Sequence, residues 1–260
     1  MSKKKLLLRA DDLGSSHSAN LAIAQAVQNG LIKNVSVMAV GPDLDDAARL
    51  LANNDTLCFG MHATLNAEWD KVKWKPLTKI TKESGLVDDQ GYFLNDPRLF
   101  IETKPRLDVI LAEFEAQLNL LTQKGFKIRY VDSHMFPEAS IEGLSEALSA
   151  WIKQKGLIDH VFYYGNPHWQ PITGITAIAD ILQNLSAGQH FMVVHPSLDT
   201  DEMRLTGNQN VSGIVVALAR DTETQVMSDK GLPQLFKELD VETIRYDQAE
   251  PGERIDFKKV

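Results

Sequence analysis

The stretch "LLLRADDLGSS", residues 6–16, begins as an apolar strand and ends in two adjacent aspartates, a glycine and two serines. Two neighbouring carboxylates that are both ionised repel each other and are costly to remove from water. A surface loop could hold Asp11 and Asp12 without that cost. Alternatively, one of them binds a metal ion and the other acts as a base. The residues at the other strand ends decide between these two interpretations.

The composition of the 260-residue chain is typical of a globular protein, with 43% hydrophobic and 24% charged residues. No stretch approaches the roughly 18 apolar residues that a membrane span needs. A net charge of −8 without a basic tract argues against nucleic acid as a partner. The single cysteine, Cys58, lies among apolar residues and indicates a packing role. The N-terminal lysines precede only a short apolar run, so we expect no signal peptide and a cytoplasmic protein.

Short apolar runs alternate with segments of helical period along the chain, which favours a repeating β/α fold. About seven strands with helical crossovers predict a distorted (β/α) barrel, and an open doubly wound sheet is the alternative. We expect one domain over residues 1–260. The predicted strands are residues 4–9, 35–40, 57–62, 127–132, 160–164, 190–195 and 241–246, and the predicted helices are 18–30, 44–54, 106–125, 140–156, 175–185 and 231–240.

Residues 66–105 interrupt this rhythm, because they contain no long helical pattern and are punctuated by proline and glycine. Such a long irregular insertion in a compact domain is usually functional or disordered. Aromatic residues within it, Trp69 and Trp74 among them, favour a folded loop over the strand ends.

Acids and histidines stand at the carboxyl ends of several predicted strands. The pair at 11–12 ends the first strand, His62 the third, residues 132–134 (Asp-Ser-His) the fourth and His195 the sixth. In a parallel α/β fold these ends gather at one face, where active sites form. Imidazole and carboxylate together suit a first-row divalent metal and leave coordination positions open for water and substrate. The pattern therefore predicts a catalytic or metal site at this face.

The doubled aspartate fits such a site. Neighbouring residues of an extended chain face opposite ways and seldom share one set of ligands. Where the strand breaks at Gly14, one carboxylate can bind the metal while its neighbour reaches the bound water as a base. Among the remaining histidines, His17 begins a helix, and His168 is a candidate substrate contact. His160 and His190 begin predicted strands at the opposite end, and we interpret both as structural.

Four motifs in order resemble those of the YdjC-type carbohydrate deacetylases. The Asp-Asp-x-Gly turn at 11–14 is followed by Asn20 and by a strand containing Ser and Met. "FGMHATL", "YVDSHMFPE" and "MVVHPS" are similar to the family's later histidine segments. Residues 219–246 look like its closing Arg-x-x-Glu segment, helix and final strand. The resemblance runs from about residue 5 to residue 247.

This resemblance implies a polysaccharide-deacetylase-like barrel with one divalent metal ion, Mg²⁺ or Zn²⁺, that removes acetyl groups from N-acetylated sugars such as chitooligosaccharides. Carried over by position, Asp12, His62 and His134 would be the metal ligands. Asp11 would be the general base and His195 the general acid. A sugar substrate makes Trp69, Trp74 and His168 the candidate substrate contacts. A homodimer is a further implication of the family.

The chain departs from the family at Arg9, where a small polar residue is more usual. Arg9 either points toward the site, where it could tune Asp11 or bind an anionic substrate, or lies in the helix layer as an ion-pair partner. We favour the helix layer. Phe136 and Glu138 stand where further histidines often occur, which leaves the sugar specificity open.

Two other functions compete with the deacetylase. One is another metal-dependent barrel enzyme, a phosphoesterase or a sugar isomerase. The chain has no Walker-type phosphate loop and no carboxylates placed to bridge two metals. The other is a non-catalytic sugar-binding protein, which would need neither of the two proton-transfer residues.

Overall fold

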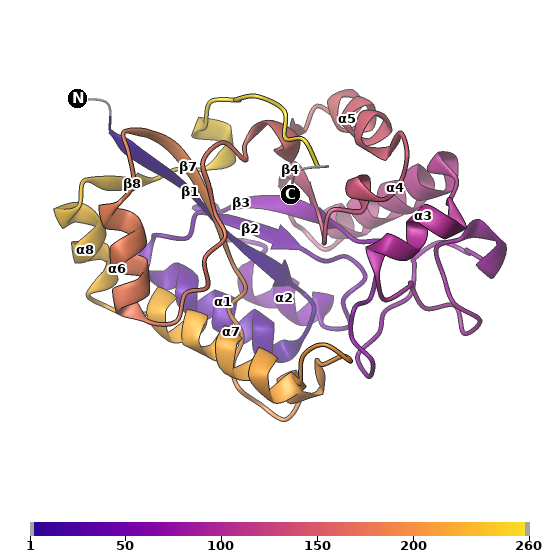
Figure 1. Ribbon diagram of the computed structural model, residues 1–260, viewed down its shortest axis with the longest axis horizontal. Coiled ribbons are helices and arrows are strands. Elements are labelled where there is room, and N and C mark those ends of the chain that lie inside the picture. The colour runs from indigo at the N-terminus through magenta and orange to yellow at the C-terminus, as the bar shows by residue number, and fades with distance from the viewer. Residues whose placement is uncertain (1–2, 258–260) are drawn as a thin grey trace.

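The computed structural model describes residues 3–257 and is built on one parallel sheet that curls around its own concave face (Figure 1). Seven strands lie in the order β5–β4–β3–β2–β1–β7–β6, and β8 pairs with the first residues of β1. This confirms the predicted α/β fold with about seven parallel strands. The strands are β1 Lys4–Leu13, β2 Asn34–Val37, β3 Cys58–Ala63, β4 Ile128–Ser133, β5 Ile158–Asp159, β6 Pro167–His168, β7 Gly188–Val194 and β8 Val241–Thr243.

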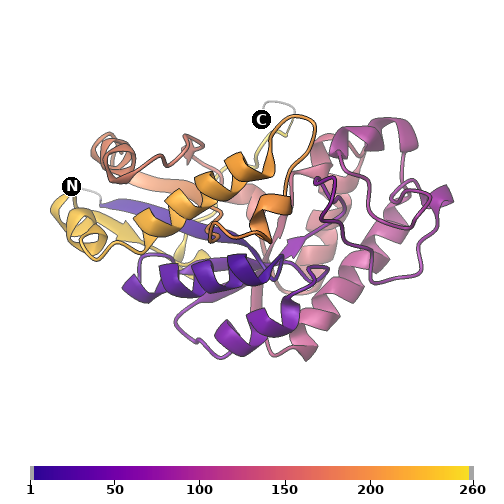
Figure 2. The same ribbon diagram turned by 90° about the horizontal axis from the view of Figure 1, so that it is seen from below.

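Helices pack against the outer, convex face of the sheet. Figure 2, seen from below, shows α7, α1 and α2 side by side in front of the strands. Within residues 3–257, no helix combines the length and the apolar character that crossing a membrane requires. The helices are α1 His17–Ala26, α2 Leu44–Leu51, α3 Phe100–Thr103, α4 Leu107–Gln123, α5 Leu144–Gln154, α6 Ile175–Gln183, α7 Gly213–Met227 and α8 Leu232–Glu238.

Alternate residues of β1 serve two different cores. Leu6 and Leu8 face the helices and belong to the large apolar core between helices and sheet. Leu7 faces the concave side, where it packs with Tyr130 and Phe191 in a smaller aromatic core. Side chains that continue the Leu7 face toward the end of the strand therefore lie inside the curled sheet.

Two predictions about secondary structure are wrong. The expected strand at 160–164 is a 3-10 turn, His160–Phe162, because the Asp159 carboxylate accepts a hydrogen bond from the backbone N–H of Val161 and starts the turn. The two-residue strands β5 and β6 lie on either side of it. Helix α7 is absent from the predicted helices, although it is 15 residues long. Its serine N-cap, Ser212, is present in the sequence, but the helix is half exposed and its apolar residues form no clear stripe.

The insertion at 66–105 is folded, as its aromatic residues predicted. Isolated bridges join Asn66 to Leu94 and Val87 to Phe93. The buried carboxylate of Glu113 on α4 accepts hydrogen bonds from the backbone of 77–78 and fixes the insertion to the helix layer. Figure 1 shows the insertion, which includes α3, on the side of the molecule toward which the strands point.

Candidate active site

A bulge at the end of β1 positions the acid pair. The pairing of β1 with β2 shifts register between Ala10 and Leu13, and Asp12 takes a left-handed backbone conformation with φ of 70°. In a regular strand the two carboxylates would point to opposite faces of the sheet. Here both are buried, and each lies near the same histidine, His62. The strand irregularity that we expected at Gly14 therefore begins two residues earlier.

His62 on β3 is oriented by the strand beside it. Its register partner on β4 is Asp132, whose Oδ2 lies 2.7 Å from His62 Nδ1. The nitrogen that faces a carboxylate carries the proton, which directs Nε2 toward the acid pair. Nε2 lies 3.5 Å from Asp12 Oδ1. Two residues before His62, a side chain on Gly60 would collide with the ring of Tyr130, so only glycine fits at this position of the Gly-x-His segment.

His134 follows β4 and is held in the same way by a different acid. Its Nε2 lies 2.9 Å from Oε2 of Glu68. Its Nδ1 lies 3.7 Å from Asp12 Oδ1 and 3.2 Å from His62 Nε2. Each histidine thus has one nitrogen fixed by a carboxylate and the other turned to a common point. Two lone pairs this close to each other need a positive charge between them, either a proton or a metal ion.

The ligand set of Asp12, His62 and His134 fits a divalent metal. Their ligand atoms all lie within 4.8 Å of one another, and all three residues are buried. Among residues 3–257, the buried Oδ1 of Asp12 has no hydrogen-bond partner, although it faces both histidines. A buried carboxylate oxygen without a partner is costly, and a cation at this point would remove the cost. The chemistry of the donor set and this unpartnered oxygen both favour a metal ion here.

A second group, formed by Asp11, His62 and Asp132, already holds a cation from the chain itself. The guanidinium of Arg9 donates to Asp11 Oδ1 at 2.6 Å and to Asp11 Oδ2 at 2.7 Å, and it lies 3.1 Å from Asp132. Arg9 continues the Leu7 face of β1 and lies over the ring of Phe191 inside the curled sheet. Its favoured location in the helix layer was therefore wrong. Because Arg9 bridges the two acids, this group is not a second metal site.

The buried charges hold one another ionised. Burial alone would lower the pKa of Arg9, but Asp11 and Asp132 raise that pKa well above its usual value. Burial likewise opposes the charge of His62, whereas Asp132 and Asp11 raise the pKa of this imidazole. For Asp12, burial acts to raise the pKa, and Arg220 with His62 and His195 lowers it well below the usual range. Since metal ligands must be deprotonated, an ion bound at His62 must displace a proton.

Helix α7 supplies two further polar contacts from one face. Arg220 donates to Asp12 Oδ2 at 2.8 Å. One turn later, Glu223 accepts a hydrogen bond from the backbone N–H of His195 at 2.5 Å. The structure thus brings Asp11, Asp12, His62, His134 and His195 to one place. The contacts of Glu68, Arg220 and Glu223 were not predicted, although the Arg-x-x-Glu spacing was visible in the sequence.

The three candidate substrate contacts have partners within the protein. Trp74 is only 5% exposed, donates from Nε1 to the carbonyl of Asn66 and packs edge-on against His134. It supports the histidine and has no open face for a sugar, which corrects its prediction as a stacking residue. His168 bonds to His190 at the amino end of β7, away from the ligand set. Trp69 is partly buried against the small apolar cluster around Met203. His17, the first residue of α1, is exposed on the surface and pairs with Asp46.

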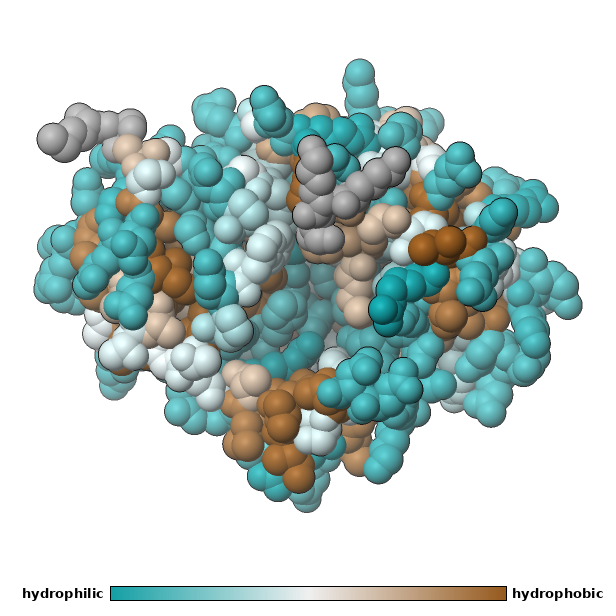
Figure 3. Space-filling view, viewed as in Figure 1, coloured by the Kyte–Doolittle hydropathy of each residue, from teal (hydrophilic) through white to brown (hydrophobic). Residues whose placement is uncertain are grey.

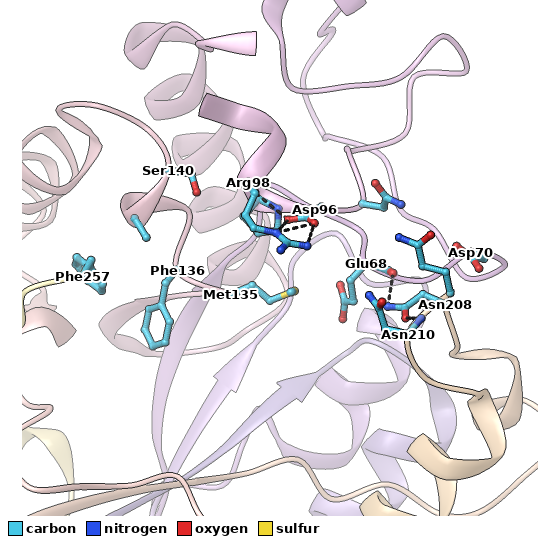
Figure 4. Close-up of a pocket in the computed structure, with 14 residues that line it drawn as sticks. Glu68, Asp70, Asp96, Arg98, Met135, Phe136, Ser140, Asn208, Asn210 and Phe257 are labelled. Atoms are coloured by element: carbon cyan, nitrogen blue, oxygen red, sulfur yellow. Dashed lines mark hydrogen bonds and ion pairs between the residues drawn. The ribbon is translucent and has the colours of Figure 1, made fainter. Parts of the chain in front are cut away.

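A pocket of about 370 Å³ opens beside His134. Glu68, which fixes the ring of His134, also lines this pocket, and so does Met135, the next residue in the chain. Figure 3 shows a hollow near the middle of the same face of the molecule, with mostly hydrophilic residues inside it. Figure 4 shows Phe136 and Phe257 on one side of the pocket and Asp70, Asn208 and Asn210 on the other. Its volume is in the range of small-molecule sites.

Comparison with known proteins identifies relatives that match nearly the whole chain. A carbohydrate deacetylase of Clostridium beijerinckii is 25% identical and matches 93% of this chain and 98% of its own length. A carbohydrate deacetylase of Thermoanaerobacter pseudethanolicus is 26% identical over 94% of this chain and 98% of its own length. A crystal structure from Enterococcus faecalis, of a protein named for cellobiose-phosphate cleavage, superposes with a TM-score of 0.75. It is 20% identical and covers 95% of this chain and 99% of that one, so it supports the fold.

The family assignment comes from the N-terminal part of the chain. The model of the YdjC-like protein family matches residues 5–161, which is more than half of the sequence. This range contains the acid pair, His62 and His134, whereas His195 and the contacts from α7 lie beyond it. The chain belongs to the YdjC-like protein family.

Proposed function

We propose that this chain is a metal-dependent carbohydrate deacetylase, formed as one domain, that hydrolyses the acetamide of N-acetylated sugars. The observation that carries the proposal is the unpartnered, buried Oδ1 of Asp12, toward which His62 and His134 each turn one nitrogen. Family membership and the names of the relatives support the reaction class.

In this proposal Asp12, His62 and His134 hold one divalent ion, Zn²⁺ or Mg²⁺. When bound, such an ion polarises a carbonyl oxygen and makes a bound water more acidic. Asp132 and Glu68 keep the two imidazoles oriented, as outer carboxylates do in metal sites. Arg220 holds the second oxygen of Asp12, so that Oδ1 alone remains to bind the ion.

In this proposal Asp11 accepts a proton from the attacking water. Each of its oxygens accepts a hydrogen bond from Arg9 and retains a second lone pair for the water. As the water oxygen bonds to the acetamide carbon, its proton passes to Asp11. The carbon–nitrogen bond then breaks, and the imidazolium of His195 donates a proton to the nitrogen. The products are acetate and the free amine of the sugar.

The competing functions receive less support. A two-metal phosphoesterase would need a second cation site, but the group next to the ligand set is bridged by Arg9. A sugar-binding protein would need neither of the two proposed proton-transfer residues, Asp11 and His195. The deacetylase is therefore the one function that we propose.

Acetate release from N,N′-diacetylchitobiose by metal-stripped protein, resupplied with one divalent ion at a time, tests the function. We expect metal-dependent release. Asp11→Asn and His195→Gln should each lower kcat by about 10²–10⁴-fold, because each removes one proton transfer. The bound metal should remain in both variants, since neither residue is a proposed ligand.

Asp108→Asn is the matched control, because Asp108 is an exposed acid on α4 that pairs with Arg106. It should release acetate at the wild-type rate. Near-normal turnover in Asp11→Asn would show that the base is another group. No acetate with any ion, in protein that binds the metal, would contradict the deacetylase itself.

Three finer points belong to this proposal as predictions. The substrate is of the chitooligosaccharide type, the protein acts in the cytoplasm, and it forms a homodimer. Ile214, Val215 and Leu218 near the start of α7 are apolar and half-exposed, and they would suit a subunit contact. Figure 3 shows apolar surface over α7 at the lower edge of the molecule. Light scattering on the purified protein measures the oligomeric state.

A further inference from the structure

We infer that a basic pocket at the amino ends of β3 and β4 binds a phosphate group. The pocket measures about 100 Å³, and Lys127, Arg129 and Arg245 are the cations among its lining residues. It lies at the opposite end of these strands from the ligand set, because His62 and His134 stand near their carboxyl ends. The inference is therefore independent of the proposed function.

Two distant parts of the chain bring these cations together. Lys127 immediately precedes β4, Arg129 is the second residue of that strand, and Arg245 follows β8. Arg245 Nη1 donates to the carbonyls of Asp55 and Thr56, at 3.3 and 3.4 Å, which holds this side chain against the loop before β3. The net charge of the chain is −8, so the cluster is not part of a generally basic surface. Cations around one small space disfavour each other's charge, and an anion between them would stabilise them all.

Arg129 is the extra residue of a bulge in β4. Between two successive register pairs β3 advances by one residue and β4 by two, so Arg129 has no partner across the ladder. Bulges bend a strand and re-aim a side chain, often at functional sites. Among residues 3–257, the guanidinium of Arg129 makes no hydrogen bond or ion pair, although it lines the pocket. The bulge thus presents a cation with five unused N–H donors to this space.

Two neighbouring side chains keep donors for the same ligand. Nζ of Lys127 donates to Asp55 Oδ1 at 2.7 Å, and two of its three N–H groups remain. Asn54, which also lines the pocket, accepts two hydrogen bonds from Thr56 through Oδ1. Its NH₂ group has no partner within the described part of the chain. The pocket therefore offers N–H donors from at least two charged groups and one amide.

The acids around the pocket leave the charge of Arg129 unbalanced. Asp55 offsets Lys127, and Asp247 binds Nε and Nη2 of Arg245, both at 2.9 Å. No acid pairs with Arg129 among residues 3–257. An anion in the pocket would provide the missing partner.

Phosphate is the anion that fits these donors. Its oxygens accept hydrogen bonds from several directions, and the planar guanidinium of an arginine binds two of them at once. A phosphate group carries nearly two negative charges at neutral pH, more than an acetate ion. The pocket is smaller than the roughly 300–1,000 Å³ of typical small-molecule sites, so the phosphate group alone would lie inside it. Inorganic phosphate and a phosphorylated sugar share this chemistry.

Calorimetric titration of the full-length protein with inorganic phosphate tests the inference. We expect saturable binding, and sodium acetate at the same ionic strength should not bind at this site. Arg129→Gln should weaken phosphate binding by about tenfold or more, because a hydrogen bond to a charged group contributes about this much. Phosphate should also raise the melting temperature of the wild-type protein more than that of the variant, since a ligand stabilises the state that binds it.

Arg106→Gln is the matched control, because Arg106 is an exposed arginine that pairs with Asp108 and does not line the pocket. It should bind phosphate as tightly as the wild-type protein. Glucose 6-phosphate, with glucose as its neutral counterpart, identifies the source of the group. Tighter binding than that of inorganic phosphate, again weakened in Arg129→Gln, would support the inference and assign the pocket to a sugar phosphate. Binding of inorganic phosphate alone would support it for the free ion.

Two results would overturn the inference. Phosphate binding of unchanged strength in Arg129→Gln would place the ion elsewhere, for example at a metal ion in the ligand set. Equal binding of phosphate and acetate, or no saturable binding of either, would show an adventitious ion only.

Discussion

The ligand set and the pocket beside it use polar side chains in opposite ways. Around the ligand set, Asp11, His62 and His134 have polar atoms bound to other groups of the protein, whereas Oδ1 of Asp12 and Oδ1 of Asp132 have no hydrogen-bond partner among residues 3–257. In the pocket, Asn210 and Asp70 have side chains without partners among residues 3–257. The groups proposed for catalysis are therefore fixed before a substrate arrives, which lowers the cost of reaching the transition state. The polar side chains that line the pocket are, in contrast, left free.

The residues of the ligand set are also more buried than those of the pocket. Asp12, His62 and His134 are at most 5% exposed, whereas Asp70 and Asn210 are on the surface. Changes in the ligand set should therefore alter metal binding and stability, and changes in the pocket should alter substrate affinity alone. Four variants, Asp12→Asn, Asp132→Asn, Glu68→Gln and Trp74→Phe, test this division in order of expected effect.

Asp12→Asn should have the largest effect. It removes the only acidic ligand of the proposed ion and leaves Arg220 facing a neutral amide. We expect the purified protein to contain almost no metal and acetate release to fall by on the order of 10³-fold or more. Elemental analysis of the metal and an acetate assay measure the two quantities.

Asp55→Asn is the control, because Asp55 is an exposed acid that pairs with Lys127. It should retain the wild-type metal content. If Asp12→Asn still bound one ion per chain at wild-type affinity, the ion would lie elsewhere and the ligand set would be wrong.

Asp132→Asn and Glu68→Gln compare the two acids that orient the histidines. Loss of such an outer partner typically weakens metal affinity by about 10–100-fold. Asp132 should have the larger effect, because it is fully buried and also pairs with Arg9, whereas Glu68 borders the open pocket. Competition with a chelator measures the affinity, and urea unfolding measures stability.

Only Asp132→Asn should also lower the free energy of unfolding, by up to about 3 kcal/mol, since it leaves Arg9 with one acid instead of two. Equal losses of metal affinity and of stability in both variants would show that the deeper burial of Asp132 does not make it more important than Glu68.

The sequence was sufficient to predict which residues would meet. Parallel strands bring their carboxyl ends to one edge, so side chains after β1, β3, β4 and β7 had to lie close together once the β/α alternation was recognised. The prediction needed no side-chain detail. The prediction failed where the position of a side chain depends on how a particular strand is bent, as at Asp12. It also failed where that position depends on which side of the sheet faces the helices, as at Arg9.

Side-chain partners that come from distant segments of the chain could not be predicted from the sequence either. Glu68 reaches His134 from a part of the insertion without regular secondary structure, and Arg220 reaches Asp12 from a helix whose apolar residues follow no clear stripe. Neither contact follows from periodicity or from local spacing. The same limit explains Trp74, because an aromatic residue in an irregular loop can pack inward or face a ligand, and composition does not distinguish the two.

Trp74→Phe should have the smallest effect on catalysis. Trp74 packs against the ligand set, and this variant tests whether it also contacts the substrate. Phenylalanine keeps the ring against His134 but loses the hydrogen bond from Nε1 to the carbonyl of Asn66. We expect the free energy of unfolding to fall by about 0.5–1.5 kcal/mol. KM for N,N′-diacetylchitobiose should stay within about twofold of the wild-type value, because the ring is buried and outside the pocket. A tenfold rise in KM with unchanged stability would show that Trp74 contacts the sugar. The substrate would then bind directly beside the ligand set.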